Sequence, residues 1–375
     1  MRNYAIMTKS VLISTMHRGN NYGSALQVYA LSEKIKQYGY IPIILDYIPD
    51  RINEKKLFIQ NLKKLFRGSF YDKYQVFRGM LIRGSSYLCY NRFFKKNLYL
   101  TKKYYGIEDV LNNFPEADIY MTGSDQVWNS VHNYGIDPVF FLAFAPNNKP
   151  KVSYAASFGR ERINDNEIDE TRLLLSRYRN ISVREKSGLK ILNFLGVEKE
   201  NKWVLDPTFL LDRTEWRKKA ILHRENSKYV LIYSVEPDKK SVIHIARNIA
   251  DYIGAKVYMV EWGRKPYQGV DKMISLVDPL MLIDYFDKAE FIVASSFHGT
   301  ALSLNFNKQF VSIYPACFST RVESILNLVG LDSRLIKSSD FSLEMISNKI
   351  DYTKVNKRID KARNESINYL YRILQ

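Results

Sequence analysis

The chain has 375 residues, 46% of them hydrophobic and 25% charged, a composition that suits a globular protein long enough for two domains. No apolar run approaches the roughly 18 residues of a membrane-spanning helix, and the two cysteines, Cys89 and Cys317, exclude a disulfide framework and favour a cytoplasmic location. The formal net charge is +17, but no nucleic-acid-binding motif accompanies it, so a nucleic-acid partner is not expected.

The first half of the chain alternates short β-rich runs with helical periods. Its first apolar run predicts a buried strand rather than a signal peptide, because a small-residue cleavage site is missing. Strands are expected at 11–16, 41–46, 118–122, 151–158, 181–184 and 202–205, and helices at 24–37, 167–177 and 187–194. Strands that alternate with helices predict a parallel sheet with crossover helices.

The second half repeats this alternation. Strands are expected at 229–235, 256–261, 291–294 and 310–314, and helices at 239–252, 279–286, 301–307 and 320–329. The pattern predicts an α/β protein of two Rossmann-like domains, with a boundary near 211–215. Apolar residues at helical spacing from Val355 to Leu374 predict a final helix that packs back on the first domain.

A basic insertion interrupts the first domain at 51–104. Between Arg51 and Lys103, fourteen Lys and Arg residues face two acidic ones, so this segment supplies +12 of the net charge. Phenylalanines are interleaved with the basic residues, a pattern that suits an anionic membrane surface or an anionic ligand. A solvated insertion whose aromatic side chains pack on the protein is the alternative.

Two polar segments follow predicted strands of the first domain. In HRGNNYGS (17–24), glycines let the backbone approach a ligand and Ser24 can cap the next helix, although a plain tight turn would look the same. In TGSDQVWN (122–129), Trp128 offers a ring face to a sugar and Asp125 a carboxylate to a hydroxyl proton. The alternative is a capped helix with a core tryptophan. The candidate acceptor-binding residues are Asn20, Asn21, Tyr22, Ser124, Gln126, Trp128 and Asn129.

Arg184 stands at the end of another predicted strand, in SVREKSG (182–188). Its planar guanidinium can bind a carboxylate or phosphate with two parallel hydrogen bonds. A structural ion pair with a carboxylate such as Glu185 is an equally good interpretation.

The segment SSFHGTALSLNF (295–306) joins the strand at 291–294 to a helical run. Such a junction presents side chains and backbone N–H groups at the edge of the sheet where ligands bind. His298 can transfer protons or hold an anion there, with Ser296, Gly299, Thr300 and Arg321 as further candidates for binding an anionic donor. Clustered His and Cys residues at metal-ligand spacing are missing, so neither a metal nor a cofactor is expected.

Six stretches, in chain order, resemble the polysaccharide pyruvyl transferase family. They are GNNYGSALQVYAL (19–31), TGSDQVWN (122–129), YAASFG (154–159), ISVREKSG (181–188), VLDPTFLLD (204–212) and SSFHGTALSLNF (295–306). The resemblance implies a GT-B-like fold with a cleft between two Rossmann-like domains. Residues 1–212 would form the acceptor side, 213–345 the donor side, and 346–375 a helix that returns to the first domain.

The reaction implied by the resemblance transfers pyruvate from phosphoenolpyruvate, a co-substrate, to a sugar of a cell-surface glycan or its lipid-linked precursor. It forms a pyruvate ketal and releases phosphate. Arg184 and His298 match family residues that contact phosphoenolpyruvate. Many members carry arginine where this chain has Ser296. Two interpretations follow: Arg321 or Arg18 replaces that charge, or the donor is a different one.

Two other functions stay open from the sequence. One is a GT-B glycosyltransferase that uses a nucleotide sugar, and the other is a non-catalytic protein that binds glycan or lipid. The expected location is the cytoplasm, with peripheral contact at the inner face of the membrane through 51–104.

Overall fold

The computed structural model describes residues 9–19, 21–49, 70–197, 199–224, 227–236, 239–261, 267–315 and 319–375, and the side chains of 70–83 are not described. The predicted site residue Asn20, Cys317 and much of the basic segment 51–104 therefore lie outside the described part. The chain divides into two compact units. The first comprises Met1–Arg67, Phe94–Leu210 and Glu365–Gln375, and the second Gly68–Phe93 and Leu211–Asn364.

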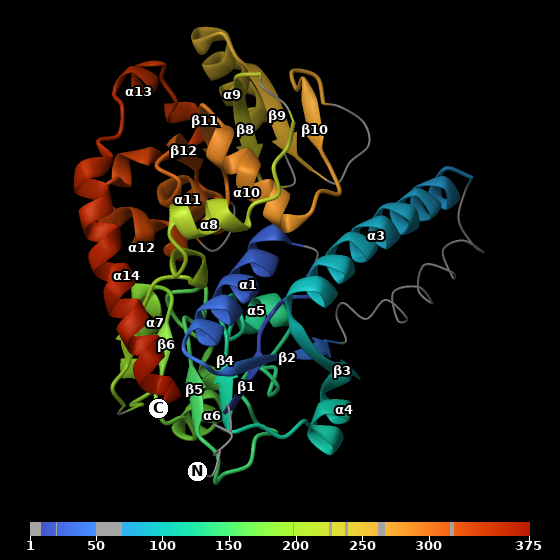
Figure 1. Ribbon diagram of the computed structural model, residues 1–375, viewed down its shortest axis with the longest axis vertical. Coiled ribbons are helices and arrows are strands. Elements are labelled where there is room, and N and C mark those ends of the chain that lie inside the picture. The colour runs from blue at the N-terminus through green and yellow to red at the C-terminus, as the bar shows by residue number, and fades with distance from the viewer. Residues whose placement is uncertain are drawn as a thin grey trace, which may run out of the picture. The chain divides into compact units, whose positions relative to one another are not determined.

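The first unit is built on a parallel five-stranded sheet in the order β3-β2-β1-β4-β5 (Figure 1). Its strands are β1 (Ser10–Ser14), β2 (Ile41–Ile48), β3 (Tyr99–Tyr105), β4 (Ile119–Thr122) and β5 (Lys151–Ser153). Strands β6 (Ser182–Val183) and β7 (Lys202–Trp203) form a separate two-stranded parallel sheet. Isolated parallel β-bridges connect β5 and the residues after it to β6 and the residues before it. The described helices of this part of the chain are α1 (Tyr22–Gln37), α3 (Phe70–Asn97), α4 (Gly106–Asn113), α5 (Ser130–Asn133), α6 (Ile168–Ser176) and α7 (Lys186–Phe194).

Local signals explain why α1 follows β1 so closely. Asn21 caps the helix, its side chain accepting hydrogen bonds from the N–H groups of Gly23 and Ser24. Lys34 and Lys36 lie in the last turn, where positive charge stabilises the helix dipole. Most of α1 is buried, as expected of a crossover helix that covers a parallel sheet.

The second unit holds a parallel six-stranded sheet in the order β10-β9-β8-β11-β12-β13. Its strands are β8 (Tyr229–Tyr233), β9 (Lys256–Val260), β10 (Lys272–Ile274), β11 (Phe291–Ala294), β12 (Gln309–Ile313) and β13 (Leu335–Ile336). Its helices are α8 (Arg213–Lys219), α9 (Lys240–Ile253), α10 (Pro279–Lys288), α11 (Phe297–Asn305), α12 (Thr320–Val329) and α13 (Glu344–Ser347). Trp216 of α8 is fully buried.

Central strand β8 shows why this sheet is covered on both faces. All five of its residues, YVLIY, are buried, and alternate side chains point to opposite faces. Val230 and Ile232 belong to a core cluster with the apolar face of α9, which ends at Gly254 in the left-handed conformation (φ 64°). Continuous apolar strands of this kind are typical of buried parallel sheets.

Both sheets reverse their strand order at one point. In the first unit the order changes direction between β1 and β4, and in the second between β8 and β11. Ligands of open α/β sheets bind at the carboxyl ends of the strands at such switch points. The segments that follow these four strands are therefore the places where a site is expected.

The C-terminal helix α14 (Tyr352–Leu374) contributes to both units. Its last part packs in the first unit, where the Ser366 hydroxyl accepts a hydrogen bond from Leu205 N (2.9 Å) and the Tyr369 hydroxyl donates to Ser153 O (3.2 Å). Two assignments differ from the sequence prediction. Gly68–Phe93 belongs to the second unit although the basic insertion was expected in the first, and α14 is divided after Asn364.

Candidate functional site

The ends of β1 and β4 meet closely at the switch point of the first unit. Gly123 N donates to Ser14 O (2.9 Å), and the Thr15 hydroxyl donates to Ser124 O (2.7 Å). A Cβ on Gly123 would lie 2.8 Å from the Cβ of Thr15, closer than two carbon atoms approach. The glycine of the TGSD motif is therefore needed to bring these two strand ends together.

Asp125 presents its carboxylate at this edge of the sheet. Oδ2 accepts a hydrogen bond from the Ser24 hydroxyl (2.6 Å), and Oδ1 accepts from Gln126 N (3.0 Å) and from Nη2 of Arg184 (3.2 Å). Its backbone has φ 78°, a left-handed conformation that is uncommon for a residue with a side chain. The residue is only 8% exposed, so its orientation is strongly fixed by these contacts.

Arg184 is the centre of a buried ion network. Its side chain is fully buried, with Nη1 donating to Oδ2 of Asp206 (2.7 Å) and Nη2 to Oδ1 of Asp125. Burial lowers the pKa of the guanidinium, but the two carboxylates outweigh burial and raise the pKa above its usual value. The prediction that Arg184 binds an anionic donor needs correction, because its charge is already neutralised inside the protein. Its role in this arrangement is to hold two carboxylates.

Two further acidic residues of this network were not assigned a site role from the sequence. Asp206 is 1% exposed and accepts hydrogen bonds from Arg184 and from the N–H and hydroxyl of Thr208. Glu185 is fully buried, and its Oε1 accepts from Ser157 Oγ (3.1 Å), Phe158 N (2.9 Å) and Gly159 N (3.0 Å). An acidic residue directly after a strand was the available signal in both cases.

Glu185 also helps to position Asp125 through the turn that it binds. Ser157 N donates to Asp125 O (3.1 Å), so the turn held by Glu185 fixes the backbone of the candidate base. Gly159, at φ 63°, lies against Gln126, and a Cβ there would approach Gln126 Oε1 to 2.5 Å. The stretches at 122–129, 154–159 and 181–188 thus form one connected structure around Asp125.

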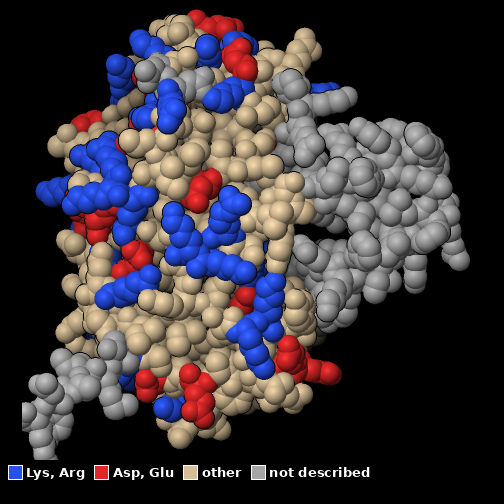
Figure 2. Space-filling view, turned by 45° about the vertical axis from the view of Figure 1, so that its right-hand side comes forward, with Lys and Arg blue, Asp and Glu red and all other residues tan. Residues whose placement is uncertain are grey.

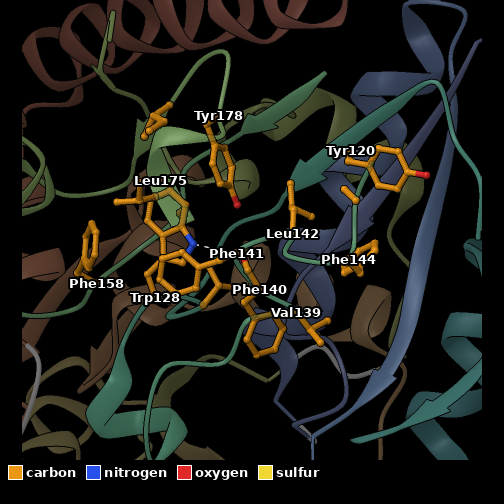
Figure 3. Close-up of a cluster of buried hydrophobic side chains, with 14 of the residues drawn as sticks. Tyr120, Trp128, Val139, Phe140, Phe141, Leu142, Phe144, Phe158, Leu175 and Tyr178 are labelled. Carbon is orange, nitrogen blue, oxygen red and sulfur yellow. Dashed lines mark hydrogen bonds between the residues drawn. The ribbon is translucent and has the colours of Figure 1, made fainter. Parts of the chain in front are cut away.

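Trp128 has no ring face available to a sugar. It is 3% exposed and stacks on Phe141 at 5.5 Å between ring centroids, while its Nε1 donates to Phe140 O (3.2 Å). Figure 3 shows the indole enclosed by Phe141, Phe158 and Tyr178. The predicted sugar contact is therefore wrong, and the alternative interpretation of a core tryptophan is the correct one.

The other predicted acceptor-binding residues are mostly structural. Asn21 caps α1, Asn129 caps α5 and donates to Gln126 Oε1 (2.7 Å), and Tyr22 is 4% exposed. Ser124 is fully buried, and its hydroxyl donates to Asp206 (3.2 Å). These residues shape the strand ends, and among the described ones Asn21 and Gln126 are partly exposed.

Arg18 does not supply a spare cation at this edge. Its Nε and Nη2 donate to the two oxygens of Asp46 at 2.6 and 2.5 Å, and its side chain is 6% exposed. Burial raises the pKa of Asp46, but hydrogen bonds from His17 and Arg18 lower it to about 2. Arg18 is thus committed to a structural pair, which overturns the expectation that it replaces the missing arginine.

The second unit places His298 in the first turn of α11, at the carboxyl end of β11. The imidazole packs edge-on against Phe297, with ring centroids 5.3 Å apart, and is 6% exposed. The guanidinium carbon of Arg321, in the first turn of α12, lies 5.8 Å from the centre of the Phe297 ring. The structure therefore brings two of the predicted donor-site residues around one phenylalanine.

Ser296, Gly299 and Thr300 build the start of α11. The Ser296 hydroxyl accepts from Gly299 N (3.1 Å), and the Thr300 hydroxyl lies 2.7 Å from the hydroxyl of Ser312 on β12. A Cβ on Gly299 would lie 2.9 Å from both the Ala294 Cβ and a ring carbon of Tyr233. These three residues set the close approach of α11 to the sheet and so position His298. The Ser296 side chain is partly exposed, whereas Thr300 is buried.

The described residues contain no group of three or more His, Cys, Asp or Glu side chains placed to hold a metal ion. Within the same residues, no helix combines the length and apolar character that a bilayer span requires.

Comparison with known proteins identifies the family. A model of the polysaccharide pyruvyl transferase family matches residues 21–316. The search of curated proteins gave no match. A protein assigned as a UDP-N-acetylglucosamine 2-epimerase from Listeria monocytogenes has a similar structure, with a TM-score of 0.55 and 9% identity over 96% of this chain and 91% of that chain. The spinosyn forosaminyltransferase SpnP is similar as well, with a TM-score of 0.50 and 10% identity over 96% of this chain and 95% of that chain.

At these identities the similar structures establish the fold alone, which is GT-B-like with two Rossmann-like units, as the sequence predicts. The family model covers most of the chain and includes the strands β4, β8 and β11 with the segments that follow them. The chain therefore belongs to the polysaccharide pyruvyl transferase family.

Proposed function

We propose that the protein transfers pyruvate from phosphoenolpyruvate to two hydroxyl groups of one sugar, on a cell-surface glycan or its lipid-linked precursor. The observation that carries this proposal is the family match over residues 21–316. It is supported by polar groups at both switch points, where a catalytic base, a proton donor and a cation are each available.

Phosphoenolpyruvate is assigned to the edge of the second sheet. It is small and carries a carboxylate and a phosphate, so it requires positive charge and N–H donors. The amino end of α11 supplies the positive end of a helix dipole, and Arg321 adds a full positive charge beside Phe297. His298, in the same turn, is the candidate proton donor.

The acceptor sugar is assigned to Asp125. Its carboxylate is held by Ser24, Gln126 and Arg184, and 11% of its side chain is exposed, so a hydroxyl can reach it. Asp125 shares the guanidinium of Arg184 with Asp206, and its carboxylate is the group that we assign to accept a proton from a sugar hydroxyl.

The proposed reaction balances without a further reactant. The methylene carbon of phosphoenolpyruvate gains a proton and becomes a methyl group, and one sugar hydroxyl attacks the adjacent carbon. The second hydroxyl then forms a C–O bond to that carbon as the bond to phosphate breaks. The two sugar hydroxyls lose two protons in total. One balances the proton that the methylene carbon gains, and the other is taken up by the released phosphate.

Phosphate release tests this function. The parent and His298→Ala proteins are incubated with phosphoenolpyruvate and a panel of free and lipid-linked oligosaccharides, and inorganic phosphate is measured. We expect acceptor-dependent release that falls by roughly 10²–10⁴-fold in His298→Ala, the usual range for general acid–base catalysis. His244→Ala, which removes an exposed histidine of α9, is the matched control.

Two outcomes would overturn the proposal. A folded His298→Ala protein with parental activity would remove histidine from the mechanism. Turnover of a nucleotide sugar, with none of phosphoenolpyruvate on any acceptor, would favour the nucleotide-sugar glycosyltransferase instead.

We also propose that the segment 51–104 brings the enzyme to the inner face of the cytoplasmic membrane, where a lipid-linked acceptor would lie. The side chains of this segment are described from residue 84 onward. In that part Lys95, Lys96 and Lys102 are exposed, as is Tyr99, with 61% of its surface accessible. Lysine and tyrosine are favoured at a membrane interface. On the face drawn in Figure 2, Lys and Arg outnumber Asp and Glu.

A further inference from the structure

A surface cavity of about 350 Å³ lies in the first unit, beside strand β7 of the two-stranded sheet. Cavities of roughly 300–1,000 Å³ are typical of small-molecule sites. It is formed by β7 and the adjoining residues on one side and the last turns of α14 on the other. Its lining residues are Glu200, Lys202, Trp203, Val204, Glu365, Asn368, Tyr369 and Arg372.

Trp203 gives the cavity a fixed aromatic wall. Its Nε1 donates to Arg184 O (2.8 Å), so the polar atom of the indole is satisfied by the main chain and the ring orientation is set. The residue is only partly buried, unlike Trp128, and Nζ of Lys186 lies 5.6 Å from the ring centre. An oriented, accessible indole whose polar atom is already used offers an apolar face to a ligand.

The rim of the cavity is polar and electrically balanced. Glu365, Asn368 and Arg372 are exposed and lie on one face of α14, at helical spacing. Opposite them, Glu200 forms half-exposed ion pairs with Arg372 (2.9 Å) and Lys202 (3.3 Å). The four ionised groups of the rim, two acidic and two basic, cancel in charge. The ligand that fits is therefore uncharged overall, rich in hydroxyl groups and apolar on one face.

We propose that this cavity, which we call the Trp203 cavity, is an accessory glycan site that holds a sugar residue of the acceptor away from the reacting one. A pyranose ring presents C–H groups on one face and hydroxyls around its edge. Its face would pack on Trp203, and its hydroxyls would bond to Asn368, Glu365 and the ion-paired groups. The assignment of the ligand as part of the acceptor rests on the proposed function.

Binding and turnover are measured separately to test the site. Hexasaccharides of glucose, galactose, mannose and N-acetylglucosamine, with the matching monosaccharides, are titrated into the full-length protein by calorimetry and by saturation-transfer NMR. We expect at least one hexasaccharide to bind, and Trp203→Ala to weaken its binding at least about fivefold. Asn368→Ala should weaken it roughly two- to tenfold, the effect of one hydrogen bond.

Matched variants exclude general damage to the protein. Tyr134→Ala removes an aromatic residue that is 87% exposed elsewhere in the first unit, and Asn193→Ala removes an exposed helical asparagine. Neither should change glycan binding. Because Asn368 is exposed, its variant is expected to fold even if Trp203→Ala does not.

The outcomes separate this site from the proposed reaction. Sugar binding that depends on Trp203 and Asn368, without phosphate release from phosphoenolpyruvate, would support the Trp203 cavity as a glycan site and refute the proposed reaction. Phosphate release, with no hexasaccharide binding that either variant weakens, would support the reaction and refute the glycan site. If both hold, the Trp203 variant should lower turnover of long acceptors and leave that of the shortest acceptor unchanged.

Discussion

Replacing Arg184 by alanine should destabilise the first unit rather than simply weaken donor binding. The change leaves the carboxylates of Asp125 and Asp206 facing each other without their shared cation, and Asp206 is 1% exposed. Removing one partner of a buried ion pair costs about 3–5 kcal/mol. At 1.36 kcal/mol per factor of ten, the unfolding equilibrium constant should rise by about 10²–10⁴-fold.

Urea titration followed by far-UV circular dichroism measures this change. Arg184→Lys should lose less stability than Arg184→Ala, because lysine keeps the charge but lacks the planar fork that reaches two carboxylates. The matched control is Arg172→Ala, since Arg172 pairs with Asp169 at 2.7 Å with 47% of its side chain exposed. Exposed pairs contribute less than about 1 kcal/mol.

One result would refute the reasoning about Arg184. If the alanine variant unfolds at the parental urea concentration and binds phosphoenolpyruvate more weakly, the residue is a donor ligand after all. The buried network would then not describe its role in the working enzyme.

Three further predictions concern stability and the membrane. Asp46→Asn should have a lower free energy of unfolding than the parent near neutral pH, and the lowered pKa of Asp46, about 2, contributes about 2 kcal/mol to the difference. In urea titrations this difference should become smaller as the pH falls from about 4 to about 2, and a difference that does not change with pH would contradict the prediction. Gly299→Ala should lower the free energy of unfolding by about 1–3 kcal/mol in the same assay, because the added Cβ would press against Ala294. The control Gly84→Ala, which has open space around it, should not destabilise the protein, and equal effects of the two changes would disprove the packing argument. The segment 51–104 should carry the protein to anionic but not neutral vesicles at low salt, and sedimentation that is the same with both would leave the segment as a solvated insertion.

The sequence predicted elements best where an apolar run had clear ends. The strand at Phe291–Ala294 and the helix at Thr320–Val329 have the predicted bounds. The helix expected at 301–307 begins earlier, at Phe297, because Ser296 acts as its cap and Gly299 packs inside it. Strand β3 was not predicted, since its sequence YLTKKYY is largely exposed and lacks a regular alternation.

The site was harder to predict because its contacts join distant parts of the chain. Ser24 and Asp125 are 101 residues apart, and Arg184 and Asp206 are 22 apart on neighbouring strand ends. Their pairing depends on which strands are neighbours in the sheet, which local patterns do not specify. For the same reason, the position of Trp128 after a polar loop could not show whether its ring pointed to a ligand or to the core.

Each unit contains a buried tryptophan, Trp128 in the first and Trp216 in the second. Because indole fluorescence shifts to longer wavelength when water reaches the ring, these residues can act as intrinsic optical reporters. Trp128→Phe would remove the buried reporter of the first unit, and Trp216→Phe that of the second. Comparing the two variants during unfolding would show whether the units melt together or one after the other.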